Sequence, residues 1–111
     1  RHSTSRSLCL VDEFGKGTNA QDGISMLHAC LNHFLGRGDE CPIVLACTHF
    51  TELLRIPGFK RQPQLALSTM QVMQQKADGD DETNLDDTVF LYRAQPGEST
   101  DAFGWACALM G

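Results

Sequence analysis

Two uninterrupted apolar runs, separated by a stretch with helical periodicity, constrain the fold of this chain more than any other feature. The runs are Leu8–Val11 and Ile43–Cys47. Such runs are typical of parallel strands that are covered on both faces. Between them, from about Ala20 to Leu35, apolar residues recur at helical spacing, and Gly36 provides a stop. The pattern predicts an α/β fold, with a parallel sheet core built on a strand–helix–strand unit and a right-handed crossover.

The rest of the sequence predicts shorter elements after this unit. A short helix is expected over Thr51–Ile56, strands over Leu65–Val72 and Val89–Tyr92, and the start of a final helix near Ala102. The segment 78–87 carries six carboxylates in ten positions, which predicts a solvated connection. No repeat or low-complexity segment interrupts this order.

Composition bounds the class of protein. A length of 111 residues fits one ordinary domain, and a hydrophobic fraction of 41% is typical of a globular chain. The net charge of −5 argues against a nucleic-acid groove within this segment. The chain starts with Arg1 and ends in an apolar stretch, so we expect both ends to be cuts through a longer protein. Neither a signal peptide nor a membrane-length apolar run is present, which predicts no membrane partner.

The cysteines predict a reducing compartment. They form no C-x-x-C pair, so a zinc site is not favoured. The expectation is that they are small buried hydrophobic residues rather than disulfide partners. The five are Cys9, Cys30, Cys41, Cys47 and Cys107.

An acidic pair, Asp12-Glu13, directly follows the first predicted strand, and Thr48-His49 follows the second. The carboxyl ends of neighbouring parallel strands meet at one edge, so these four side chains should face one crevice. An apolar strand ending in Asp-Glu is how P-loop ATPases place Mg²⁺ and attacking water beside a nucleotide. The sequence thus predicts ATP and Mg²⁺ as ligands. Asp12 would hold the metal through a water ligand, and Glu13 would position the attacking water. Thr48 and His49 would contact the nucleotide, with His49 reaching the γ-phosphate.

A glycine-rich loop comes after the acidic pair. Gly15 and Gly17 permit sharp backbone turns, and Lys16 between them can meet a phosphate or a partner carboxylate, or be an ordinary exposed lysine. Asp12-Glu13 alone would also suit a solvated loop start. A G-x-x-x-x-G-K-[ST] phosphate cradle is missing from the 111 residues. The chain is therefore expected to carry half of an active site.

Residues 8–50 resemble the ATPase domain of MutS-family DNA mismatch-recognition proteins, in the ABC branch of P-loop ATPases. The resemblance rests on the series Asp12-Glu13-Phe14-Gly15-Lys16-Gly17-Thr18-Asn19-Ala20-Gln21-Asp22-Gly23. It also rests on Thr48-His49-Phe50, before which Cys47 is an inserted or substituted position. Phe14 and Lys16 look most like a meiotic member, since mismatch-repair members usually have Ile or Leu and Arg there.

The resemblance implies roles for these residues. Asp12 resembles the Walker B metal-binding aspartate, Glu13 the catalytic glutamate and His49 the switch histidine. A loop that crosses the subunit interface in ABC dimers is matched by Gly15, Lys16, Gly17, Thr18, Asn19 and Asp22. Residues 1–111 would then be the C-terminal half of a P-loop NTPase domain, with the Walker A motif upstream.

For the whole protein, the resemblance implies a nuclear, ATP-driven clamp on DNA. It would pair with a second MutS-family subunit as a heterodimer. It would bind double-stranded, branched or mismatched DNA through upstream domains, in meiotic recombination or mismatch repair. One alternative is a different ABC-type DNA-repair ATPase, although the loop from Gly15 to Asp22 argues against it. Another is a truncated, non-catalytic module that dimerises through this loop.

Overall fold

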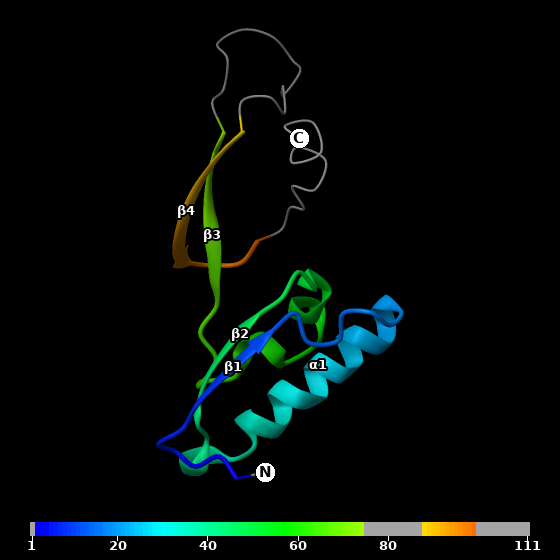
Figure 1. Cartoon of the computed structure of the whole chain (residues 1–111), viewed down its shortest axis with the longest axis vertical. Helices are drawn as coiled ribbons and strands as arrows, with labels where there is room; N and C mark the ends of the chain where they lie inside the picture. The colour runs from blue at the N-terminus through cyan, green and yellow to red at the C-terminus, as the bar shows by residue number, and fades with distance from the viewer. Residues whose placement is uncertain (1, 75–87, 100–111) are drawn as a thin grey trace, which may run out of the picture. The chain divides into compact units, whose positions relative to one another are not determined.

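The computed structural model describes residues 2–74 and 88–99, in two units that divide after Leu65. The first unit contains β1 (Leu8–Asp12), α1 (Ala20–Leu35) and β2 (Ile43–Cys47) (Figure 1). Short 3-10 helices follow α1 and β2: η1 (Gly38–Glu40), η2 (Thr51–Arg55) and η3 (Phe59–Arg61). The acidic segment 78–87, the predicted final helix and Cys107 lie outside the described residues.

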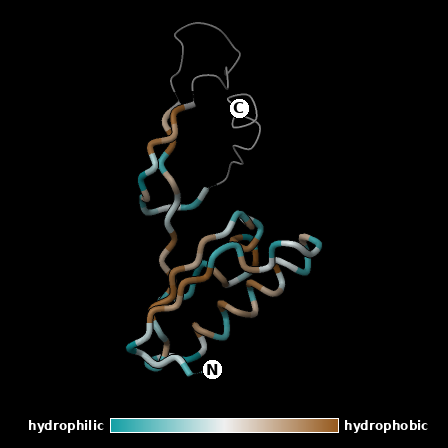
Figure 2. Tube along the Cα trace, in the orientation of Figure 1, coloured by the Kyte–Doolittle hydropathy of each residue, from teal (hydrophilic) through white to brown (hydrophobic). Residues whose placement is uncertain are grey.

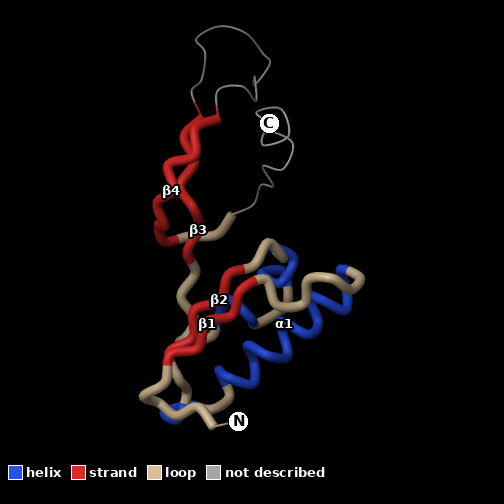
Figure 3. The backbone as a smooth tube through the Cα atoms, in the orientation of Figure 1, coloured by secondary structure: helices blue, strands red, loops and turns tan. Residues whose placement is uncertain are grey.

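β1 and β2 form a parallel pair, as predicted. Their register runs from Leu8 opposite Ile43 to Asp12 opposite Cys47, so both strands end at the same level. In Figure 3 the two strands lie side by side with α1 along one face. The residues that follow β1 and β2 therefore leave the sheet next to one another, as the sequence predicts.

The helix α1 has the bounds that the sequence predicts because both of its ends are capped. Asn19 has extended backbone angles, and its side-chain oxygen accepts a hydrogen bond from the Asp22 N–H at 2.9 Å. Asp22 also places a negative charge in the first turn, where it complements the helix dipole. At the other end, the Gly36 N–H donates to the Asn32 carbonyl at 2.9 Å.

The buried core of the first unit lies between α1 and the segment after β2. Leu27 is fully buried, and Phe50 is 8% exposed. Leu53 and Phe59 complete the buried cluster. Partly buried side chains pack around these four: Val11, Ile24, Leu31, Leu35, Leu54, Ile56 and Leu65. The core therefore ties the position of α1 to the chain that follows His49.

We expect Leu27→Ala to destabilise the chain by about 2–5 kcal/mol, because it leaves a cavity in a core with few buried residues. Met26→Ala is the matched control, since Met26 lies on the same helix and is 49% exposed. It should change the free energy of unfolding by no more than about 0.5 kcal/mol. Urea titrations of the 111-residue chain measure both values, and equal losses for the two variants would contradict the placement of the core.

The predicted cover on both faces of the strands is wrong for the residues that the structure describes. Alternation along β1 and β2 turns one face toward α1 and leaves the other exposed. Figure 2 colours both strands hydrophobic along their length. We call the open side the apolar face; its residues are 60–70% exposed, and they are Leu8, Leu10, Ile43 and Leu45.

The prediction of buried cysteines also needs correction. Cys9, Cys30 and Cys41 are only partly buried, and Cys47 is exposed. The strand alternation explains Cys47, which lies on the same side of β2 as Ile43 and Leu45. All four described cysteines are free thiols, as predicted.

The second unit is a hairpin of β3 (Ser68–Gln74) and β4 (Thr88–Pro96), paired antiparallel. β3 begins later than the predicted Leu65, and β4 extends beyond the predicted Tyr92. A register shift between Met70 and Val72 accompanies a left-handed φ of 52° at Tyr92, whose side chain is 83% exposed. Within the described part of the chain, α1 and its shorter companions lack the length and apolar character of a membrane-spanning helix.

Candidate functional site

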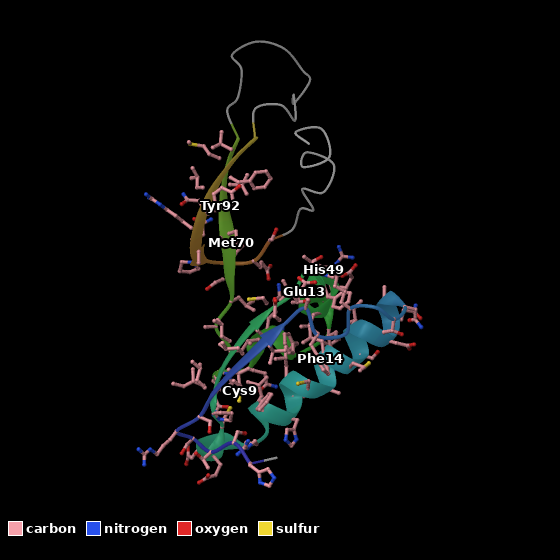
Figure 4. The ribbon with its side chains drawn as sticks, viewed as in Figure 1. Cys9, Glu13, Phe14, His49, Met70 and Tyr92 are labelled. Atoms are coloured by element: carbon pink, nitrogen blue, oxygen red, sulfur yellow. The ribbon has the colours of Figure 1, made fainter. Side chains whose placement is uncertain are left out.

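Glu13 and His49 follow the two neighbouring strands, and their side chains meet. Nδ1 of His49 lies 2.6 Å from Oε2 of Glu13. An ionised carboxylate can only accept, so Nδ1 donates the hydrogen bond. The side chains are 35% exposed for Glu13 and 59% for His49, so water reaches both. Figure 4 labels the pair where the strands end. The predicted proximity of these two residues is therefore observed.

The backbone makes a sharp turn at Glu13. Its N–H donates to the Cys47 carbonyl at 3.0 Å, which extends the sheet ladder by one residue beyond Asp12. Its φ is 48°, in the left-handed region, and the Lys16 N–H closes the turn by donating to the Glu13 carbonyl at 3.1 Å. A residue with a side chain adopts this conformation at a cost of about 1–3 kcal/mol and keeps it only when its surroundings enforce it.

His49 is placed by the residues on either side of it. The Thr48 hydroxyl accepts a hydrogen bond from the Phe50 N–H at 3.0 Å, which makes a local turn. The Phe50 ring is buried, and its centre lies 4.5 Å from that of His49, with the rings tilted by 41°. A buried aromatic side chain thus supports an exposed imidazole.

The predicted interface loop lies largely on the surface. Lys16, Gly17 and Thr18 are exposed, while Gly15 is partly buried. Asn19 and Asp22 are exposed too, but they also cap α1, and the Asn19 amide donates to the Asp22 carboxylate. This capping role was not predicted, although Asn followed three residues later by Asp resembles a capping box. The cap fixes where the loop enters the helix.

Asp12 ends β1 as an exposed carboxylate on the same side of the strand as Leu8 and Leu10. Among residues 2–74 and 88–99, no three His, Cys, Asp or Glu side chains are grouped so that they could hold a metal ion. A single carboxylate nevertheless suits Mg²⁺, which keeps several waters and takes its other ligands from phosphates. The donors at the end of β1 therefore fit Mg²⁺ better than zinc.

Comparison with known proteins bears on this site. The whole chain, residues 1–111, matches the family model described as MutS domain V. It is 36% identical over 104 residues to the DNA mismatch repair protein MSH3 of Eremothecium gossypii, covering 94% of this chain and 9% of that protein. It is 31% identical over 114 residues to MutS protein homolog 5 of Saccharomyces cerevisiae, covering 96% of this chain and 12% of that protein.

A second MSH3, from Kluyveromyces lactis, is 36% identical over 106 residues, covering 96% of this chain and 10% of that protein. The chain thus spans about a tenth of the length of the curated relatives that it matches. Glu13 and His49 both lie inside the matched region.

Proposed function

Because this chain belongs to the MutS family and forms part of its ATPase domain, we propose that it supplies the water-activating half of an ATP-hydrolysing site in a longer protein. The observation that supports this most is the hydrogen bond between His49 and Glu13 at the end of the parallel pair. A partly exposed carboxylate that is oriented by a second group is well suited to act as a general base.

In this proposal, Glu13 takes a proton from the water that attacks the γ-phosphate. His49 fixes the carboxylate through Nδ1, which leaves its Nε2 to face the phosphate. The Thr48 hydroxyl accepts from the Phe50 N–H and still has its own proton to donate to a phosphate oxygen. Asp12 would hold Mg²⁺. The bound ion would supply positive charge that offsets the negative charge on the phosphates.

The phosphate cradle would come from the rest of the ATPase domain, packed on the apolar face. The 111 residues contain no Walker A motif, which fits a C-terminal half of the domain. The apolar face runs along β1 directly to Asp12, so whatever covers it also lies beside the proposed metal site. Covering each of its four side chains would contribute about 1.5–3 kcal/mol. Both considerations favour a phosphate-binding lysine carried by the covering segment.

The partner would be a second MutS-family subunit, which meets the exposed residues Lys16 to Thr18. Binding of double-stranded, branched or mismatched DNA would fall to domains outside this chain, in the nucleus.

We assign the chain to the meiotic branch, as MutS protein homologue 5, because of Phe14 and Lys16. The MSH3 relatives at 36% identity support mismatch repair as the second candidate. Loss of crossing-over in cells lacking the protein, with an unchanged mutation rate, would favour the meiotic function. A raised mutation rate with normal crossing-over would favour mismatch repair.

The proposed metal role is tested by Asp12→Asn in the full-length protein. Removing the charge should raise the Mg²⁺ concentration for half-maximal hydrolysis by about tenfold or more, since carboxylates are the preferred protein ligands of this ion. Asp39→Asn makes the same change in η1, before β2 begins, and should leave the requirement unchanged. Steady-state ATPase assays over a Mg²⁺ series measure both. An unaltered requirement in Asp12→Asn would remove Asp12 from the metal site.

A further inference from the structure

Gly23, in the first turn of α1, is contacted by two segments that are far apart in the sequence. A Cβ atom at this position would lie 2.5 Å from the Gly15 carbonyl oxygen and 2.9 Å from Cζ of Phe50. Both distances are below 3.0 Å, and Cβ atoms in real proteins almost never have contacts that short. The contact with the loop is mutual, because a Cβ on Gly15 would lie 2.6 Å from the Gly23 carbonyl oxygen. Only glycine fits at this point.

The two segments that meet at Gly23 are those that carry the acid and the imidazole. Gly15 follows Glu13 by two residues, and Phe50 follows His49 directly. Gly23 itself is fixed to the helix cap, since its N–H donates to the Asn19 carbonyl at 3.0 Å. The N-terminal turn of α1 therefore provides one contact point for both segments.

We propose that Gly23 and Phe50 are positioning residues that set the distance between Glu13 and His49 for hydrolysis. This inference rests on the proposed function. Glu13 and His49 are partly solvent-exposed, so their own packing restrains them weakly. Gly15 and Phe50, in contrast, lie so close to Gly23 that a Cβ atom there would meet the Gly15 carbonyl oxygen and the Phe50 ring at less than 3.0 Å. The first turn of α1 thus sets the distance between the segments that carry Glu13 and His49.

Helix energetics support a specific need for glycine at this position. Within a helix, glycine is less favourable than alanine by about 0.5–1 kcal/mol. Gly23 is buried on α1, so alanine would otherwise stabilise the helix. The added methyl would instead displace the Gly15 carbonyl or the Phe50 ring, because a close-packed interior has no room for it. Either displacement moves one member of the pair and leaves the other in place.

The first test is the ATPase activity of full-length Gly23→Ala. We expect kcat to fall about 10–100-fold with KM for ATP changed by no more than about twofold, since a misplacement near 1 Å is enough to disturb a reacting group. Gly36→Ala at the other end of α1 is the matched control. Its Cβ would meet the Asn32 carbonyl oxygen at 3.2 Å, which a small shift relieves. An unchanged kcat in Gly23→Ala would overturn the inference.

Phe50→Leu removes the ring without adding atoms, and it carries the test if Gly23→Ala does not fold. Its matched control is Phe59→Leu, in the same buried cluster but packed against the ring of His28 instead of His49. Phe50→Leu should lower kcat about tenfold, while Phe59→Leu should alter only the thermal midpoint. Equal kcat values for the two variants would contradict a positioning role.

A double-mutant cycle separates positioning from general damage to the fold. If Gly23 acts through the pair, Gly23→Ala should cost much less in kcat when His49 is already alanine. Additive losses would overturn the inference. Its failure is distinguishable from that of the proposed function: hydrolysis at the parent rate by both Glu13→Gln and His49→Ala would remove the proposed function itself, whereas loss in those two with a normal Gly23→Ala would remove only the positioning role.

Discussion

Replacing Glu13 with glutamine in the full-length protein is expected to slow ATP hydrolysis by about 10²–10⁴-fold while ATP still binds. Glutamine has nearly the same shape, and its carbonyl oxygen can still accept the hydrogen bond from His49 Nδ1. What it loses is the ability to take a proton from water. The substitution therefore removes the proposed chemistry and leaves the geometry of the pair in place.

Single-turnover hydrolysis and equilibrium binding of ATP measure the two halves of this expectation. Glu40→Gln is the control, because it makes the same change in η1. This helix precedes β2, at the opposite end of the strand from His49. The Glu40→Gln protein should hydrolyse ATP at the parent rate. If kcat of Glu13→Gln equals that of the parent protein, Glu13 is not the base. Loss of ATP binding together with hydrolysis would show instead that Glu13 acts in holding the nucleotide.

The fold around this pair was largely predictable from local sequence signals. The helix over residues 20–35 has a cap residue before it and a glycine after it, so periodicity and termini agree. A helix between two apolar runs favours a right-handed crossover to a parallel strand, and β1 and β2 do pair in parallel as neighbours. Glu13 lies beside His49 because the two strands are adjacent and end in register.

Other features depend on contacts that a single sequence does not encode locally. The apolar runs predicted strands covered on both faces, but only one face is covered within the described residues. Residue pattern reflects burial in the whole protein, and this chain spans about a tenth of its relatives. The close approach of Gly23 and Phe50 is likewise absent from the local pattern, because the two residues are 27 positions apart and meet only through the tertiary fold.

The hairpin illustrates a different limit. Alternation over Leu65–Val72 was partial, so the start of β3 was placed too early. The left-handed φ of 52° at Tyr92 accompanies a register shift that no local propensity predicts for an aromatic residue. Bulges of this kind depend on pairing with the other strand, so the residue pattern of one strand does not predict them.

The purified 111-residue chain is expected to show no ATP turnover, because the charge on the β- and γ-phosphates would meet no Walker A lysine. Positioned groups such as Glu13 act only on a substrate that is bound in reach, and an isolated strand end offers a phosphate few fixed donors. A coupled phosphate-release assay, with the full-length protein as positive control, measures this directly.

The Glu13→Gln version of the same short chain distinguishes true turnover from contamination. Turnover above the buffer blank that disappears in Glu13→Gln would refute the expectation, since it would mean that these residues bind triphosphate unaided. A trace that is equal in both chains belongs to a contaminating ATPase. The apolar face fits the expected result under the proposed function: Leu10 and Leu45 are 60–70% exposed, and another segment of the ATPase domain would cover this surface beside Asp12.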